Sequence, residues 1–142
     1  MFNVSKTDFN DFVTHFNESM EYDGDVWNDE YKEEYEGATF YRVCYDKDEV
    51  AFLAVFPENY LDTEYLEVCG VITSAIKKHI RNIKKCGVSM LDILGRETPL
   101  IASANSTDKR YGKFLEYLGF ERYKTLDFSD ENGIIYNRYV RK

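Results

Sequence analysis

The stretch YLEVCGV (65–71) places one carboxylate and one thiol in an otherwise apolar run. Enzymes often set a general base among apolar neighbours, so Glu67 is a candidate proton acceptor. The alternative is an exposed residue at the edge of a sheet. In a strand, Cys69 would lie on the same face as Glu67. A nucleophilic cysteine needs a nearby histidine, and none is predicted there, so Glu67 is the stronger chemical candidate.

The charges of the chain are divided between an acidic and a basic segment. Residues 18–36 carry nine carboxylates against a single lysine, Lys32. This segment is either a solvated acidic face or a surface for a cationic partner or substrate. Only one element is strongly basic, and its charged residues are Lys77, Lys78, Arg81, Lys84 and Lys85.

Composition excludes several classes of protein. The 142 residues suggest one domain, spanning 1–142. The net charge of −8 argues against a nucleic-acid surface, which needs clustered Lys and Arg. Three widely spaced cysteines argue against a disulfide framework and favour a reducing cytoplasm. No zinc motif, signal peptide or membrane-length apolar run is found, so we expect a cytoplasmic protein with no metal site and no membrane contact.

Periodicity in the first half predicts short strands and amphipathic helices. An extended start at 1–5 precedes a helix capped by Ser5 or Thr7, and its apolar face consists of Phe9, Phe12, Val13, Phe16 and Met20. A second helix is predicted around 28–35. Strands at 38–46 and 50–56 form a hairpin, which Pro57 and the two residues after it are expected to end. A third strand of this series is predicted at 65–71.

The second half begins with a long helix capped by Thr73 or Ser74. Gly87 is expected to end or weaken this helix, or else the run SMLDIL (89–94) carries it on for another turn. A short apolar strand follows at 99–105. Asp108 is then placed to cap a helix that ends at Gly119 in the left-handed conformation. Two closing strands, 121–128 and 134–140, are joined by a hairpin turn that contains Asn132-Gly133.

The resulting order, β-α-α-β-β-β-α-β-α-β-β, resembles the GCN5-related N-acetyltransferase (GNAT) family. That resemblance implies an α/β (α+β) fold, a mixed, mostly antiparallel twisted sheet flanked by helices. The run DKRYGKFLEYLGF (108–120) is similar to the N-x-x-A-x-x-F-Y-E-K-L-G-F-like helix of that family. The agreeing residues are Phe114, Glu116, Leu118, Gly119 and Phe120.

The resemblance implies an acetyl-CoA site where the fourth and fifth strands splay apart. In the family, backbone amides at the start of the following helix hold the pyrophosphate, because a helix N-terminus carries free N–H groups and partial positive charge. The corresponding cofactor-binding residues here are Val71, Ile72, Thr73, Ser74, Lys77, Lys78, Arg81 and Asn105. By the same resemblance, Glu67 would be the base that deprotonates the acceptor amine.

Two departures from the family pattern stand out. Nothing between Gly70 and Arg81 reproduces the pyrophosphate signature Q/R-x-x-G-x-G/A. Leu115 occupies the position where many members carry the tyrosine that protonates the leaving thiolate. Tyr111 and Tyr117 are the candidate substitutes for that acid.

Two functions follow from the resemblance. The first is transfer of an acetyl group from acetyl-CoA to a polyamine, an aminoglycoside or a protein lysine. The second is a catalytically inactive GNAT-fold protein that binds a protein partner. Some bacteriophage proteins, including virion components, are similar in the segment DKRYGKFLEYLG (108–119) and lack a clear pyrophosphate signature. Under either function we expect the partner to be a cationic small molecule or a basic protein, and we expect no nucleic acid. A homodimer is compatible with both functions. The expected location is the cytoplasm or a virion.

Overall fold

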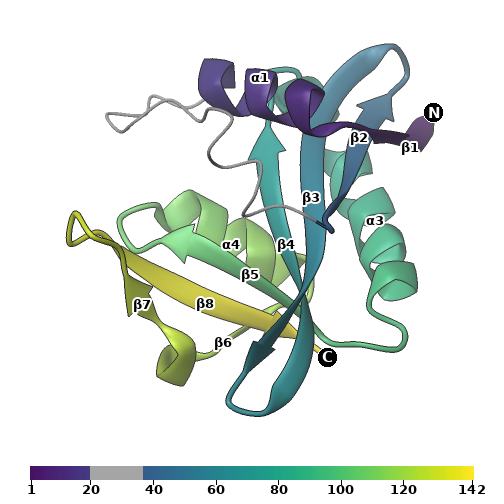
Figure 1. Ribbon diagram of the computed structural model, residues 1–142. Helices are drawn as coiled ribbons and strands as arrows, with labels where there is room; N and C mark the ends of the chain where they lie inside the picture. The colour runs from purple at the N-terminus through teal and green to yellow at the C-terminus, as the bar shows by residue number, and fades with distance from the viewer. Residues whose placement is uncertain (20–36) are drawn as a thin grey trace. The chain divides into compact units, whose positions relative to one another are not determined.

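The computed structural model describes residues 1–19 and 37–142. The helix predicted around 28–35 and most of the acidic segment therefore lie outside the described residues, as do the side-chain predictions for Phe16 and Met20. Eight strands and three α-helices are described (Figure 1). The helices are α1 (Phe9–Ser19), α3 (Ile76–Leu94) and α4 (Lys109–Tyr117).

The strands form one mixed sheet in the order β1-β2-β3-β4-β5-β8-β6, with β7 also paired to β8. Their bounds are β1 (Phe2–Thr7), β2 (Thr39–Tyr45), β3 (Asp48–Tyr60), β4 (Thr63–Ile72), β5 (Leu100–Asn105), β6 (Glu121–Arg122), β7 (Phe128–Ser129) and β8 (Ile135–Arg141). The β4–β5 pair is parallel, whereas β1–β2, β2–β3, β5–β8, β6–β8 and β7–β8 are antiparallel. The predicted fold class is confirmed.

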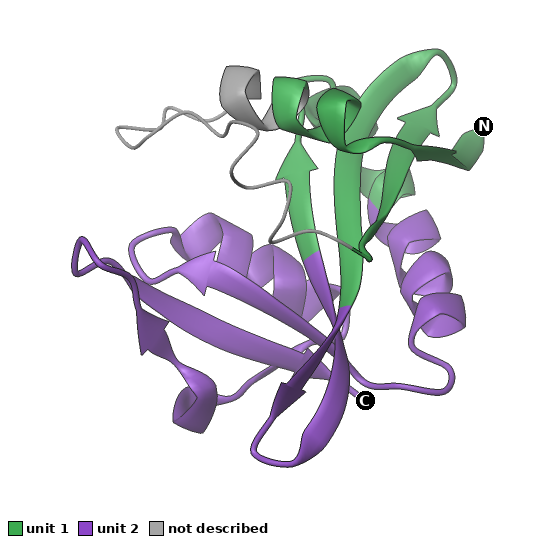
Figure 2. Cartoon of the chain, in the orientation of Figure 1, with its two compact units in different colours: residues 1–56, 69–83 green, residues 57–68, 84–142 purple. Residues whose placement is uncertain are grey.

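The described chain consists of two compact units (Figure 2). Unit 1 comprises residues 1–56 and 69–83, and unit 2 comprises residues 57–68 and 84–142. The elements β3, β4 and α3 contribute residues to both. Unit 1 has a core of Phe9, Phe12, Phe40, Phe52, Ala54 and Val71. In unit 2 a buried cluster contains Tyr65, Ile101 and Val140, with Tyr60, Tyr123 and Leu126 packed against it.

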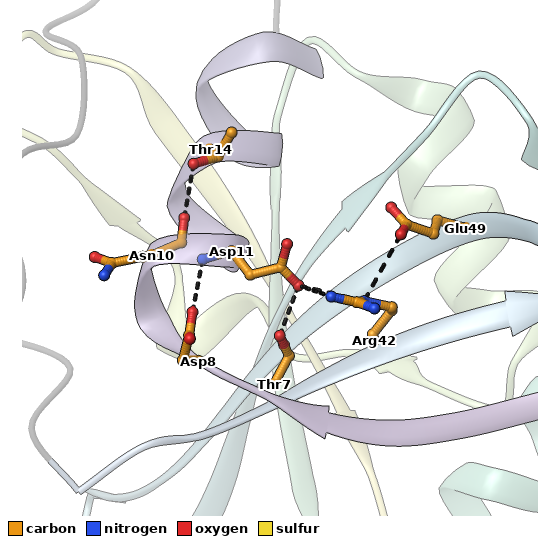
Figure 3. Close-up of polar contacts among 7 residues, drawn as sticks. All are labelled: Thr7, Asp8, Asn10, Asp11, Thr14, Arg42 and Glu49. Atoms are coloured by element: carbon orange, nitrogen blue, oxygen red, sulfur yellow. Dashed lines mark hydrogen bonds and ion pairs between the residues drawn. The ribbon is translucent and has the colours of Figure 1, made fainter.

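In unit 1, α1 begins at a different cap from the predicted one. The Asp8 carboxylate, not Ser5 or Thr7, accepts the Asp11 amide at 2.9 Å, because Asp8 directly precedes the first helical residue. Thr7 instead donates its hydroxyl to the Asp11 carboxylate at 2.6 Å. Asp11 also binds Arg42 of β2 at 2.8 Å (Figure 3). This bond, followed by the charge of Asp11, raises the pKa of the Arg42 guanidinium and ties α1 to the sheet.

The predicted stop at Pro57 is wrong, because β3 continues to Tyr60. The last register pair between β2 and β3 is Thr39 with Val55. Pro57 therefore lies beyond the reach of β2, where a missing N–H removes no bond to that strand. Residues 61 and 62 then make the two-residue connection to β4, with φ values of 50° and 64°. Two left-handed residues in such a loop are typical of a type I′ hairpin turn.

The pairing of β4 with β5 is short. Its register pairs are Leu66 with Leu100 and Glu67 with Ile101. Within residues 1–19 and 37–142 no further ladder pair joins these two strands. The ladder therefore ends at Glu67.

The long helix α3 continues through Gly87 to Leu94, so Gly87 does not end it. A Cβ atom at Gly87 would lie 3.2 Å from the Leu118 Cδ2 atom. The close approach of Leu118, the C-cap residue of α4, explains why a residue without a Cβ atom stands at position 87. Asp108 caps α4 by accepting the Tyr111 amide at 3.1 Å, as predicted.

The end of α4 is also as predicted. Gly119 has a φ of +98°. Its amide bonds the Glu116 carbonyl and the Phe120 amide bonds the Leu115 carbonyl, both at 3.0 Å. These two bonds define a Schellman motif, in which only glycine adopts the left-handed position without steric cost.

The strand predicted at 121–128 is interrupted. It consists of β6, a 3₁₀ turn (Lys124–Leu126) and β7. The cause is Asp127, whose carboxylate binds the Arg122 guanidinium at 2.5 Å and the Arg138 amide at 2.9 Å. The predicted hairpin turn is present, with Gly133 at a φ of +80°.

We expect Leu61→Asn to stabilise the protein by about 0.5–1 kcal/mol, because asparagine tolerates the left-handed conformation better than leucine. Leu61 is 78 % exposed, so the change removes no core contact. Urea denaturation monitored by circular dichroism measures the effect. Ile135→Asn is the matched control, since Ile135 is also exposed but lies in a strand. An equal gain in the control would show that loss of apolar surface, and not the turn, is responsible.

Candidate functional site

Glu67 lies in unit 2 within a closed ring of three hydrogen-bonded side chains. Its Oε1 atom accepts the Tyr60 hydroxyl at 2.6 Å and the Arg138 Nη1 at 2.8 Å. Arg138 Nη2 donates to the Tyr60 hydroxyl oxygen at 2.9 Å, which completes the ring. We call these three residues the Tyr60–Glu67–Arg138 cluster. Glu67 is neither an edge residue in open solvent nor free of partners, because its side chain is only 19 % exposed.

The sheet register explains how residues so distant in sequence meet. Glu67 is paired with Ile101 of β5, and Ile101 is paired with Val140 of β8. Side chains two residues apart in a strand lie on one face, so Arg138 lies on the same face as Val140. Arg138 can therefore reach across β5 to Glu67. The register partner of Arg138 in β5 is Ser103, whose small side chain leaves room for that path.

Arg138 is deeply buried, with a side chain that is 7 % exposed. Its guanidinium carbon lies 4.6 Å from the centre of the Tyr60 ring and 4.5 Å from that of Phe128. Its Nε atom is buried and has no hydrogen-bond partner within the described part of the chain. A buried N–H without an acceptor costs about 1–3 kcal/mol. The Arg138 side chain is therefore held mainly by two rings and by the bonds from its two terminal nitrogens.

The Tyr60 hydroxyl is held in its protonated form. Burial, followed by its hydrogen bond to Glu67, raises the pKa of Tyr60 to about 12. Tyr60 is thus a hydrogen-bond donor to Glu67 at any physiological pH.

Sequence reasoning missed both partners of Glu67. The available signal was a charged residue in each of two largely apolar strands, Glu67 in YLEVCGV and Arg138 in IIYNRYV. Two opposite charges in such strands favour a buried pair, because an unpaired charge is too costly to bury.

The predicted cofactor-binding residues around the start of α3 lie in unit 1. The Thr73 amide donates to the Val50 carbonyl at 3.0 Å, and its hydroxyl donates to the Glu49 carbonyl at 2.5 Å. Both donors of Thr73 are thus already used. Val71 is buried in the core of unit 1 and Ile72 ends β4. Among the described residues, the amides of Ser74 and Ala75 have no hydrogen-bond acceptor.

The basic residues predicted to meet CoA phosphates, Lys77, Lys78 and Arg81, are exposed on α3. His79, in the same turns, has its Nε2 atom 2.7 Å from the Asp48 carboxylate and its ring 4.8 Å from that of Tyr45. The bond with His79 is the main cause that lowers the pKa of Asp48. His79 is therefore committed to the β2–β3 hairpin.

The structure does not join the remaining predicted residues to Glu67, whose hydrogen bonds go to Tyr60 and Arg138. Tyr117 is 55 % exposed, with Lys84 Nζ 4.4 Å from its ring centre. Tyr111 is half-buried in the first turn of α4. Asn105 accepts the Thr107 amide and hydroxyl, at 3.0 and 2.8 Å, and so shapes the turn into α4. Their predicted roles stay predictions.

The described residues form neither a metal centre nor a membrane-spanning helix. No group of three or more His, Cys, Asp and Glu side chains there is arranged to hold a metal ion. No helix there combines the length and the apolar character that a membrane span requires.

Comparison with solved structures gives the fold. AAC(6')-Ib, in a structure that contains acetyl-CoA, superposes with a TM-score of 0.69 at 12 % identity, covering 99 % of this chain and 93 % of that one. A spermidine N-acetyltransferase SpeG chimera from Vibrio cholerae and hSSAT gives 0.66 at 12 % identity, covering 99 % and 94 %. The ribosomal-protein-S18-alanine N-acetyltransferase from Escherichia coli gives 0.61 at 12 % identity, covering 99 % and 93 %.

The chain has the fold of the GCN5-related N-acetyltransferases, as the resemblance implied. No protein-family model matches the sequence, and no curated protein sequence matches it. The fold is thus shared with these proteins at a level of identity that carries no residue roles with it.

We expect Arg138→Met to destabilise the protein by about 3–5 kcal/mol, because it leaves the largely buried carboxylate of Glu67 without its counter-charge. Adding Glu67→Leu should recover much of the loss, since the two charges then disappear together. Urea denaturation of the three proteins measures this. Arg122→Met is the matched control, because Arg122 pairs with Asp127 in a more exposed place, where its side chain is 24 % exposed. An equal loss in the control would contradict a special cost at Glu67.

A tyrosinate titration should show one of the twelve tyrosines ionising near pH 12, and Tyr60→Phe should remove that step. The folded-state pKa of Tyr60 lies above its ordinary value of 10. Its contribution to stability is therefore full below pH 10 and is lost as the pH rises towards 12. Tyrosinate absorbance and the unfolding free energy, both followed against pH, provide the measurement. A Tyr60→Phe protein with an unchanged alkaline transition would contradict this assignment.

Proposed function

We propose that this protein transfers an acetyl group from acetyl-CoA to a primary amine. One observation carries the proposal. Glu67, on β4 at the last rung shared with β5, presents a carboxylate with one oxygen bonded and the other accepting no hydrogen bond from the described residues, in a fold that the solved acetyltransferases also have. An available carboxylate oxygen is what an amine acceptor requires, because the amine must lose a proton before it attacks.

The proposed step conserves atoms and charge. Glu67 Oε2 takes a proton from the acceptor ammonium. The freed nitrogen lone pair forms a C–N bond with the thioester carbonyl carbon, and the C–S bond breaks with its electron pair going to sulfur. The nitrogen then releases its second proton to solvent and becomes a neutral amide, and the sulfur takes a proton from solvent. The products are an N-acetyl amide and the free CoA thiol. Leu115 is buried in α4, so no protein acid is assigned at the family's tyrosine position.

The start of α3 supports a phosphate-binding role in part. The amides of Ser74 and Ala75, which have no acceptor among the described residues, suit an anion at a helix N-terminus. The exposed Lys77, Lys78 and Arg81 add positive charge. Thr73 does not fit the predicted role without losing its two present bonds.

The acceptor is proposed to be cationic, in keeping with the net charge of −8. Among the proteins of the same fold, one is a spermidine N-acetyltransferase and another acts on an alanine of a ribosomal protein. Polyamines, aminoglycosides and protein lysines therefore form the first panel to test.

One observation favours the second function, a partner-binding protein without transfer activity. The bonds of Thr73 to Glu49 and Val50 occupy donors at the place where the family cradles pyrophosphate. Such a protein would retain the fold, fail to bind acetyl-CoA, and co-purify with a basic partner.

We expect acetyl-CoA to bind the protein and the double variant Lys77→Glu/Arg81→Glu to weaken that binding by about 10-fold, because two cations near the phosphates are reversed. Isothermal titration calorimetry measures the affinity, and release of the CoA thiol in the presence of the amine panel measures transfer. The matched control is Lys113→Glu, which reverses an exposed lysine on α4. Absence of heat and of a thermal shift at millimolar acetyl-CoA would rule out the transferase and leave the partner-binding function.

A further inference from the structure

The two oxygens of the Glu67 carboxylate have different surroundings. Oε1 accepts both the Tyr60 hydroxyl and the Arg138 Nη1, while Oε2 accepts no hydrogen bond from any described residue. Two donors on a single oxygen fix the rotation of the carboxylate plane as well as its position. The free oxygen is thereby held in one direction.

We infer that Tyr60 and Arg138 are positioning residues that aim Glu67 Oε2 at the acceptor amine. This inference rests on the proposed acetyl transfer and deepens it. Neither residue touches the reacting atoms in this arrangement, and both act through the carboxylate. They come from β3 and β8, so the direction of Oε2 is set by strands on either side of β4 and β5.

The cluster is rigid enough for this task. The Arg138 guanidinium carbon lies 4.6 Å from the Tyr60 ring centre and 4.5 Å from the Phe128 ring centre. The Phe128 ring in turn stacks on that of Tyr136, with ring centres 5.0 Å apart and planes 14° apart. A glutamate side chain in solution samples several rotamers, and ordering it costs conformational entropy. Here that ordering is complete before a substrate arrives, which lowers the barrier of the transfer step.

The charge of the cluster determines which kinetic constant should respond. The Arg138 cation offsets the Glu67 anion at 2.8 Å, so the pair supplies little long-range attraction for a cationic acceptor. Its contribution is direction, which matters in the transition state. Disturbing the cluster should therefore lower kcat and leave the KM values nearly unchanged.

The test compares the wild type with Tyr60→Phe and Arg138→Lys in steady-state assays against acetyl-CoA and a responsive amine. We expect kcat to fall about 10-fold in each variant, with KM for acetyl-CoA within about twofold of wild type. Glu67→Gln should lose about 100-fold or more, because it removes the base itself. Tyr65→Phe is the matched control, since Tyr65 belongs to the same buried cluster, 6.1 Å from Tyr60 between ring centres, and does not bond Glu67.

A double variant separates positioning from general damage. If Tyr60 acts only through Glu67, then Tyr60→Phe/Glu67→Gln should be no slower than Glu67→Gln alone. A structural role would instead give additive losses that follow the loss of thermal stability. Because Tyr60→Phe keeps the ring, it preserves the packing against Arg138, and Arg138→Lys keeps the charge opposite Glu67.

The outcomes distinguish the positioning role of Tyr60 and Arg138 from the proposed acetyl transfer. If the wild type transfers acetyl groups and Tyr60→Phe keeps a kcat within about twofold of Tyr65→Phe, the inference is overturned and the proposed function stands. The same holds if the double variant shows additive losses. If Glu67→Gln retains full kcat, Glu67 is not the base, and the inference falls while acetyl transfer remains. If the wild type transfers no acetyl group to any amine of the panel, both fall.

Discussion

A buried arginine must be given a negative partner, and in unit 2 this requirement organises the polar cluster of Tyr60, Glu67 and Arg138. Arg138 is almost completely enclosed, and the carboxylate that compensates it, Glu67, comes from a strand on the far side of β5. Removing a guanidinium from water is tolerated only when a counter-charge and hydrogen bonds replace the lost hydration. Three strands, β3, β4 and β8, are therefore committed to one polar cluster. The register of β5 with its two neighbours has to be correct for that cluster to form.

The need to support Arg138 also accounts for the structure of the segment from β6 to β7. The Phe128 ring centre lies 4.5 Å from the Arg138 guanidinium carbon, although Phe128 itself remains 41 % exposed. Asp127 accepts the Arg138 amide and pairs with Arg122, which holds the chain in a 3₁₀ turn between β6 and β7. The interruption of the last hairpin is thus a consequence of supporting Arg138 from the backbone side.

Local signals predicted local structure well. Asp108 and Gly119 bracket α4 as predicted, because capping and left-handed backbone are properties of a few adjacent residues. Predictions were wrong where adjacent residues compete for the same capping position, or where a strand distant in sequence determines how far a strand extends. Asp8 displaced Thr7 as a cap one residue away, and Pro57 is tolerated within β3 because β2 has already ended.

The candidate site was half predictable for the same reason. Glu67 was singled out as a candidate from its apolar neighbours. Arg138 is 71 positions away in the sequence, and the local sequence of β8 does not indicate which carboxylate Arg138 pairs with. That pairing depends on a parallel rung between β4 and β5 and an antiparallel rung between β5 and β8. Registers of strands distant in sequence are set by the whole sheet and cannot be read from either segment alone.

The geometry of the cluster also bears on whether Glu67 serves stability alone. An arginine and a glutamate selected only to stabilise a fold would gain most from two parallel bonds, one to each carboxylate oxygen. Arg138 instead divides its terminal nitrogens between Glu67 and Tyr60, and its Nε remains without an acceptor among the described residues. The buried Nε therefore carries a desolvation cost that no hydrogen bond offsets. Proteins retain such local costs mainly at functional sites, and the oxygen that the arrangement leaves unbonded is the one that a proton-accepting carboxylate needs.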